Sequence, residues 1–180
     1  MEITDAILSC GVKATRRYNA ISDCENDNQV PELFITSLMS TYLYDELPWH
    51  NVKLERQYLD VATELGLDAS SEAHQLLSLL RSDVAIYEGS LPIVLIEVKK
   101  FDERVHVDAI DKDLHKGDVI GLGKHVGIFA GVMVCETNVR LDVRKTELEQ
   151  IPGSRWAFSS AIRSVNREWY WCFGCGNIPS

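Results

Sequence analysis

Apolar and β-branched residues recur in two runs between residues 81 and 101, where the pattern predicts two β-strands. We expect the first strand over residues 83–88 and the second over 92–100. Gly89 and Ser90 lie between them and are typical of a chain reversal. The pattern therefore predicts a β-hairpin around which the other elements are arranged.

Three polar residues, Asp83, Glu97 and Lys99, interrupt this apolar hairpin. Glu97 and Lys99 are two apart on one strand, so their side chains point to the same face. If a three-residue loop pairs Glu88 with Pro92, Asp83 faces Glu97, and directly opposite residues share a face with Cβ atoms about 5 Å apart. A two-residue loop would turn one strand over and separate the acids. We therefore expect the hairpin to gather two carboxylates and one ammonium group.

Two adjacent carboxylates repel each other unless a cation lies between them. Their hard oxygen atoms suit Mg²⁺ or Mn²⁺, which leave coordination positions for water and phosphate oxygens. Lys99 could then stabilise charge on a phosphate or orient an attacking water. The alternative is a solvent-facing acid with a surface ion pair between Glu97 and Lys99. Residues 93–96 favour the metal site, because they are typical of an interior strand on which a charge needs a functional reason.

On either side of the hairpin, apolar periodicity predicts helices that alternate with strands. The expected helices cover residues 4–18, 31–47, 71–80, 106–122 and 138–150. The expected strands cover residues 51–59, 126–137 and 168–174. Together with the hairpin, these elements predict an α/β fold in which helices flank a mixed central sheet.

Two of these segments carry more detailed expectations. Residues 126–137 form a near-continuous apolar run, which is typical of a central strand that is buried on both faces and joined to the hairpin by a helical crossover. Residues 111–116 are mostly charged, and we expect them to form the solvated face of the helix over 106–122.

Asp83, followed across a hairpin by Glu97-Val98-Lys99, resembles the signature of the PD-(D/E)XK nuclease superfamily, which has the restriction-endonuclease-like fold. Ser82 stands where that signature usually has proline. The order of elements is also similar to the common core of that family. The resemblance implies a Mg²⁺- or Mn²⁺-dependent endonuclease or exonuclease that hydrolyses phosphodiester bonds in DNA. It implies Asp83 and Glu97 as metal ligands and Lys99 as a catalytic residue.

The length of 180 residues, with 46% hydrophobic and 25% charged residues, is typical of one folded domain with a sizeable core. The family resemblance covers roughly residues 31–137. We therefore expect a single domain, in which residues 1–30 add an N-terminal helix and residues 138–180 form a C-terminal extension.

A further acid is expected at the metal site, because in the resembled family an early helix supplies one. Glu32 lies in the first turn of the helix that begins at Pro31 and is the favoured candidate as catalytic residue and metal ligand. A negative charge in the first turn of a helix also interacts favourably with the helix dipole, which is an alternative reason for the presence of a glutamate there. Glu55, on the strand over 51–59, is the rival because it could project toward Asp83.

The chain has no apolar run long enough to span a membrane, and its N-terminal residues lack the features of a signal peptide. Five cysteines in a chain of this length indicate reduced thiols in a cytoplasmic protein, or a nuclear one in a eukaryotic cell. Cys172 and Cys175 have the spacing of half a zinc site or a redox pair. No second pair of ligands exists, so packed thiols are the favoured interpretation.

The net charge of −9 is mildly unfavourable for a protein that coats DNA, but it is concentrated in residues 1–80. The C-terminal half contains an acid-free segment between residues 150 and 167. We expect a DNA-binding face there and beside the site, formed by Lys100, Arg155, Arg163 and Arg167. An ordinary solvated face is the alternative.

Two other classes of function remain open from the sequence. One is a nuclease fold that has lost cleavage and serves as a binding or scaffold subunit, which would be marked by a broken acid pair. The other is an acidic adaptor or DNA mimic, which would need the acids of residues 1–80 to form one surface. A homodimer or a larger nuclease complex, and the choice between DNA and RNA, are also left open.

Overall fold

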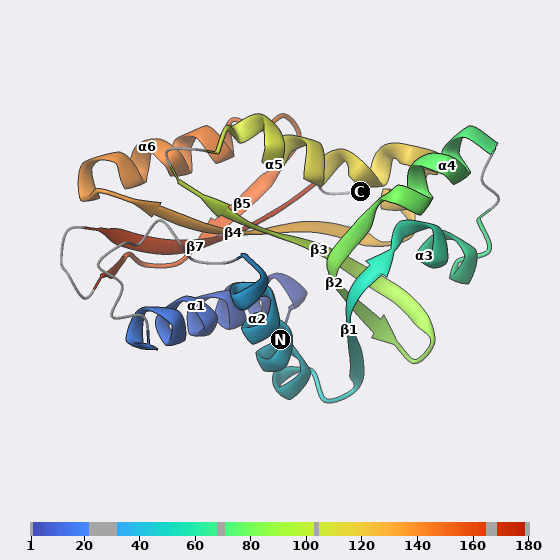
Figure 1. Ribbon diagram of the computed structural model, residues 1–180, viewed down its shortest axis with the longest axis horizontal. Coiled ribbons are helices and arrows are strands. Elements are labelled where there is room, and N and C mark those ends of the chain that lie inside the picture. The colour runs from blue at the N-terminus through green and yellow to red at the C-terminus, as the bar shows by residue number, and fades with distance from the viewer. Residues whose placement is uncertain (1, 22–31, 68–70, 103–104, 165–168, 179–180) are drawn as a thin grey trace.

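A mixed seven-stranded β-sheet runs through the described part of the chain, with helices packed against both faces (Figure 1). The computed structural model describes residues 2–21, 32–67, 71–102, 105–164 and 169–178. The predicted α/β fold with a mixed, helix-flanked sheet is therefore confirmed. None of the described helices has the length and apolar character needed to cross a bilayer.

The strands are β1 (His50–Gln57), β2 (Arg81–Glu88), β3 (Leu91–Phe101), β4 (Gly127–Glu136), β5 (Arg155–Phe158), β6 (Ile162–Arg163) and β7 (Tyr170–Asn177). The α-helices are α1 (Ile3–Ile21), α2 (Glu32–Glu46), α3 (Tyr58–Glu64), α4 (Ser71–Leu79), α5 (Val107–Leu114) and α6 (Asn138–Glu149). A 3₁₀ helix, η2 (His115–Lys124), continues directly from α5.

The strand order across the sheet is β1-β2-β3-β4-β7-β5, with β6 paired to β7. Strands β1, β2 and β3 form an antiparallel meander, and β4 is parallel to β3. A parallel neighbour requires a crossover, which α5 and η2 supply. Nine of the ten residues of β4 are buried, as expected for a central strand.

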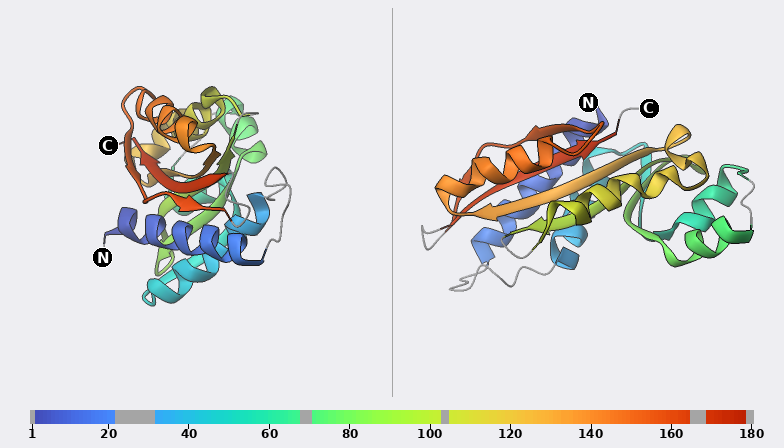
Figure 2. Two further views of the ribbon diagram at one scale, coloured as in Figure 1. Left: turned by 90° about the vertical axis from the view of Figure 1, so that its left-hand side faces the viewer. Right: turned by 90° about the horizontal axis from the view of Figure 1, so that it is seen from above.

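Two helical layers enclose the sheet, as Figure 2 shows end-on. Even-numbered residues of β3, such as Ile96, pack with α1 and α2. Odd-numbered residues pack on the opposite face, where Leu95 meets the cluster of α3 and α4 and Phe101 meets that of α5 and α6. Strand parity therefore directs Glu97 and Lys99 toward α3 and α5.

Three sequence predictions differ from the structure. The strand expected to continue to Leu59 ends at Gln57, because Tyr58 begins α3 and its N–H bonds the Leu80 carbonyl. The helix expected over 106–122 keeps α-helical geometry only to Leu114 before it tightens into η2. The strand expected to end at residue 174 continues to Asn177 as β7, which is the direct neighbour of β4.

Candidate active site

The turn of the β2–β3 hairpin contains two residues. Glu88 pairs with Leu91, which corrects the predicted pairing of Glu88 with Pro92. Gly89 at the tip has a φ of 62°, in the left-handed region that glycine adopts without strain. By itself, such a turn would place the two acids on opposite faces of the sheet.

A β-bulge in β3 compensates for this short turn. Tyr87 pairs with Pro92 but Ile86 pairs with Val94, which leaves Ile93 as the extra residue between two pairing registers. Continuing the register beyond this bulge places Asp83 opposite Glu97, so both side chains lie on one face. The bulge thus supplies the one-residue offset that the sequence interpretation assigned to the loop.

Two carboxylates bind the backbone of β3 on the side where β2 no longer pairs with it. The ladder between β2 and β3 ends at Ile96, although β3 itself continues. The N–H of Val98 donates a 2.6 Å hydrogen bond to Asp83 Oδ2. The N–H of Lys100 donates a 3.2 Å hydrogen bond to Glu32 Oε1. Acids from β2 and from the start of α2 are therefore aligned along one strand edge.

Glu97 is the most deeply buried acid of this group, with 2% of its surface exposed. Its Oε1 accepts a 3.0 Å hydrogen bond from the Tyr58 hydroxyl, and its Oε2 accepts one of 2.9 Å from Lys116 Nζ. Burial raises the pKa of Glu97 to about 7, with Lys116 opposing the shift and the negative charges of Asp113 and Asp83 adding to it. Near neutral pH, Glu97 is therefore present in both its charged and its neutral forms.

Burial also raises the pKa of Asp83, although the Val98 N–H and the charges of Lys99 and Lys116 oppose the rise. The Glu32 carboxylate adds to it by repulsion. The negative charges of these acids therefore repel one another, and a cation bound between them would reduce that repulsion.

Two lysines face the acids from different elements. Lys99 Nζ lies 3.6 Å from Asp113 Oδ2 and 3.8 Å from Glu32 Oε2. Lys116 Nζ lies 2.8 Å from Asp113 Oδ1 and 2.9 Å from Glu97 Oε2. Burial lowers the pKa of each lysine, but the facing carboxylates raise it more, so both ammonium groups stay charged at neutral pH.

The prediction that residues 111–116 form a solvated face is wrong for two of them. Asp113 is buried and Lys116 is half-buried, because both turn toward β3. The helical spacing contained this signal, since Asp113 lies beside Ile110 and Leu114 on the inward side of α5. Tyr58 was also missed as a site residue, because it was placed in a strand.

Glu32 and Glu55, the two candidates for the additional acid, have different surroundings. Glu32 reaches the β3 edge and Lys99, as described above. Glu55 is exposed, has a φ of 53°, and its carboxylate lies 3.7 Å from Arg81. The geometry therefore favours Glu32.

The predicted DNA-binding residues that lie within the described ranges do not form one patch. Lys100 is buried, with Nζ 3.1 Å from Asp102, so it is not presented to a phosphate as predicted. Arg155 and Arg163 are exposed but lie beside opposite ends of β7. Arg167 lies outside the described residues.

Cys172 and Cys175 are buried and lie three residues apart on β7, on opposite faces of the sheet. Burial raises their thiol pKa values to about 11 and about 12, respectively. Opposite faces prevent them from sharing one ion, and high pKa values keep them as thiols. Packed cysteines are therefore the interpretation that the geometry favours.

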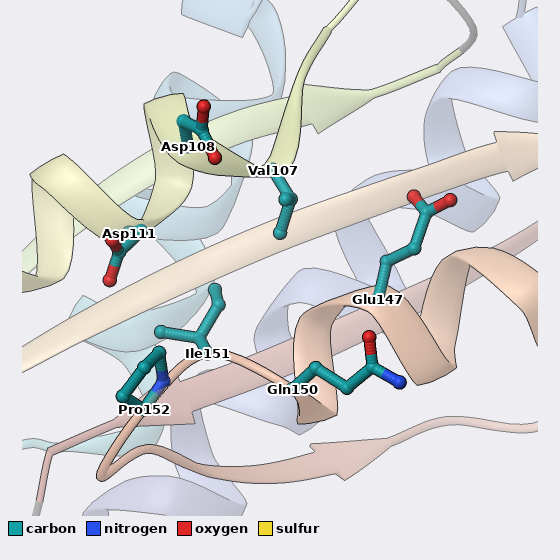
Figure 3. Close-up of a pocket in the computed structure, with 7 residues that line it drawn as sticks. All are labelled: Val107, Asp108, Asp111, Glu147, Gln150, Ile151 and Pro152. Carbon is teal, nitrogen blue, oxygen red and sulfur yellow. The ribbon is translucent and has the colours of Figure 1, made fainter.

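A pocket of about 270 Å³ lies between α5 and the end of α6 (Figure 3). Its lining residues are Val107, Asp108, Asp111, Glu147, Gln150, Ile151 and Pro152. Arg144 already pairs with Glu147 at 2.8 Å, and none of the acids on β2 or β3 lines the pocket. This cavity is separate from the candidate site.

The donor chemistry of the site suits a hard divalent ion, because its donors are carboxylate oxygens. As the described side chains stand, no three His, Cys, Asp or Glu residues enclose a metal position. Both oxygens of Glu97 are engaged by Tyr58 and Lys116. Within the described residues, however, Asp113 Oδ2 is buried without a hydrogen bond, which leaves an acceptor for an added ligand.

No protein-family model matches the chain, and neither a curated protein nor a solved structure matches it. Function is therefore inferred from the side chains and geometry of the site itself.

Proposed function

We propose that the protein is a metal-dependent nuclease that hydrolyses phosphodiester bonds in DNA, with Mg²⁺ or Mn²⁺ as its cofactor. The proposal rests on one observation. Four side chains lie together at the point where β3 separates from β2: Asp83, Glu97, Glu32 and Lys99. The chain order α2-β1-α3-α4-β2-β3-α5-η2-β4 also supports it, because apart from α3, α4 and η2 it is similar to the core of the PD-(D/E)XK superfamily.

Asp83 and Glu97 would hold the ion, with Glu32 orienting it from the start of α2. When bound, a divalent ion lowers the pKa of a bound water and polarises the phosphate. The Val98 N–H fixes Asp83 through one oxygen, Oδ2, and so orients the other. Glu32 is held in the same way by the Lys100 N–H.

Lys99 acts as a fixed positive charge in this mechanism. Because its pKa is raised by Asp113 and Glu32 despite burial, it remains an ammonium group and does not serve as a general base at neutral pH. It can donate hydrogen bonds to a water or to a phosphate oxygen and stabilise the charge that develops there.

The acidic DNA-mimic alternative is disfavoured by how the acids are distributed. The described acids of residues 1–80 are spread over several elements on both sides of the sheet. Five of them have lysine or arginine partners: Glu32, Glu46, Glu55, Asp60 and Glu64. A binding subunit without cleavage is not distinguished by geometry and is an outcome of the test.

The test incubates purified protein with supercoiled plasmid, linear duplex DNA, single-stranded DNA and RNA, each with Mg²⁺, Mn²⁺ or EDTA. The proposal predicts cleavage of at least one DNA substrate with either metal and none with EDTA. Metal-dependent DNA binding without cleavage would support a non-cleaving subunit instead. Cleavage of RNA alone would correct the substrate class.

A further inference from the structure

Lys116 lies where a cation is needed. Its ammonium group bridges two carboxylates from different elements, Glu97 on β3 at 2.9 Å and Asp113 on α5 at 2.8 Å. Both carboxylates are buried, whereas Lys116 keeps about a fifth of its side chain exposed, 21%. Lys116 therefore reaches Glu97 and Asp113 from the solvent side.

Asp113 has more acceptor capacity than its neighbours use. Its Oδ1 accepts from Lys116, but its Oδ2 accepts no hydrogen bond among the described residues and lies 3.6 Å from Lys99 Nζ. The residue as a whole is 7% exposed. A buried carboxylate oxygen without a donor is costly unless a ligand satisfies it.

We infer that Asp113 belongs to the divalent-ion site and that Lys116 is an internal counter-ion, which the divalent ion displaces from Glu97 and Asp113. This inference rests on the proposed function for the presence of the ion. It assigns roles to two residues that the nuclease motif leaves without any.

The exchange has a physical basis in charge. The ammonium groups of Lys99 and Lys116 together offset only part of the negative charge of the four surrounding carboxylates, and a divalent ion in place of Lys116 offsets more. An ammonium at the same carboxylates also repels an incoming cation. Lys116 therefore weakens metal binding, and in moving away it leaves a positive charge free beside the site for a phosphate.

The experiment measures Mn²⁺ binding by calorimetry, without nucleic acid, for the parent protein and for Lys116→Met, Lys112→Met and Asp113→Asn. Lys112 is an exposed lysine of α5, so its variant controls for the general loss of one positive charge. We expect Lys116→Met to bind Mn²⁺ about tenfold more tightly and Asp113→Asn to bind it about tenfold more weakly. Lys112→Met should stay within about twofold of the parent protein.

Unchanged or weaker Mn²⁺ binding by Lys116→Met would overturn the inference. Circular dichroism verifies folding, and Lys116→Gln replaces the methionine variant if that variant does not fold. The nuclease proposal is judged separately by cleavage. If the parent protein cleaves DNA and Lys116→Met binds Mn²⁺ with unchanged affinity, the nuclease proposal stands and the counter-ion role of Lys116 is overturned. If Lys116→Met binds Mn²⁺ more tightly but the parent protein cleaves no substrate, the counter-ion role stands and the nuclease proposal is overturned.

Discussion

Asp83 and Glu97 lie on the same face of the sheet, one position beyond the last pair of the β2–β3 ladder, Val84 with Ile96. The bulged residue Ile93 maintains this relationship, because the turn itself is one residue too short for it. Deleting Ile93 should therefore rotate the following part of β3 by one residue. We expect such a variant to lose cleavage by more than about 100-fold, and also stability, since Glu97 would then point into the apolar cluster under α1 and α2.

A matched variant separates the effect of strand register from a general loss of structure. Deleting Ile93 while inserting one glycine after Ser90 moves the extra residue from the bulge into the turn and keeps Asp83 opposite Glu97. This variant should recover a large part of the cleavage that the deletion alone removes. Equal loss in both variants, with both folded by circular dichroism, would contradict the role of register.

The stability of the metal-free protein should fall as pH rises from about 4.5 to about 7. Burial raises the folded-state pKa of Glu97 from 4.5 to about 7, so between these values the folded state binds more protons than the unfolded state. The contribution is fully present below about pH 4.5, is lost as pH rises through 7, and is on the order of 3 kcal/mol. Urea unfolding in EDTA at several pH values measures it.

Glu97→Gln is the control for that pH dependence. Without an ionisable group at this position, the variant should show a flatter profile and be more stable than the parent protein at pH 7 in EDTA. Parallel pH profiles for the two proteins would show that Glu97 does not titrate in this range.

Tyr58→Phe should shift the acidic limb of the cleavage profile to higher pH. The hydroxyl donates a 3.0 Å hydrogen bond to Glu97 Oε1, and its removal makes the charged form of Glu97 less favourable. We expect a shift of up to about one pH unit and a loss of stability of about 1–3 kcal/mol. Exposed Tyr44→Phe is the control and should match the parent protein in both measurements. An unshifted limb in Tyr58→Phe would place the titrating group elsewhere.

Glu32→Gln should abolish most cleavage while DNA binding is retained, because the start of α2 presents this carboxylate to Lys99 and the β3 edge. Glu55→Gln should cleave at a rate within about twofold of the parent protein, since its carboxylate is exposed beside Arg81. Cleavage rates and DNA affinities measured side by side decide between the two acids. Loss of cleavage in Glu55→Gln alone would transfer the role to β1.

The sequence predicted the shared face of Asp83 and Glu97 for a partly incorrect reason, because a β-bulge at Ile93 has no clear local signature. It did not reveal that Asp113 and Lys116 join the cluster, although Asp113 lies on the apolar side of its helix. The burial of Lys100 was equally hidden from local pattern. The first miss arises from contacts between α5 and β3, which the crossover creates, and the second from the ion pair of Lys100 with Asp102. Short-range periodicity encodes neither.

The most direct measurement is the single-turnover cleavage rate of duplex DNA with Mg²⁺ for the Asp83→Ala/Glu97→Ala double variant. Its control is Glu88→Ala, which removes an exposed acid from the same hairpin. The proposed site predicts that the double variant, with its fold retained, loses at least about 1,000-fold in rate, whereas Glu88→Ala cleaves like the parent protein. A folded double variant that cleaves as fast as the parent protein would contradict the assignment.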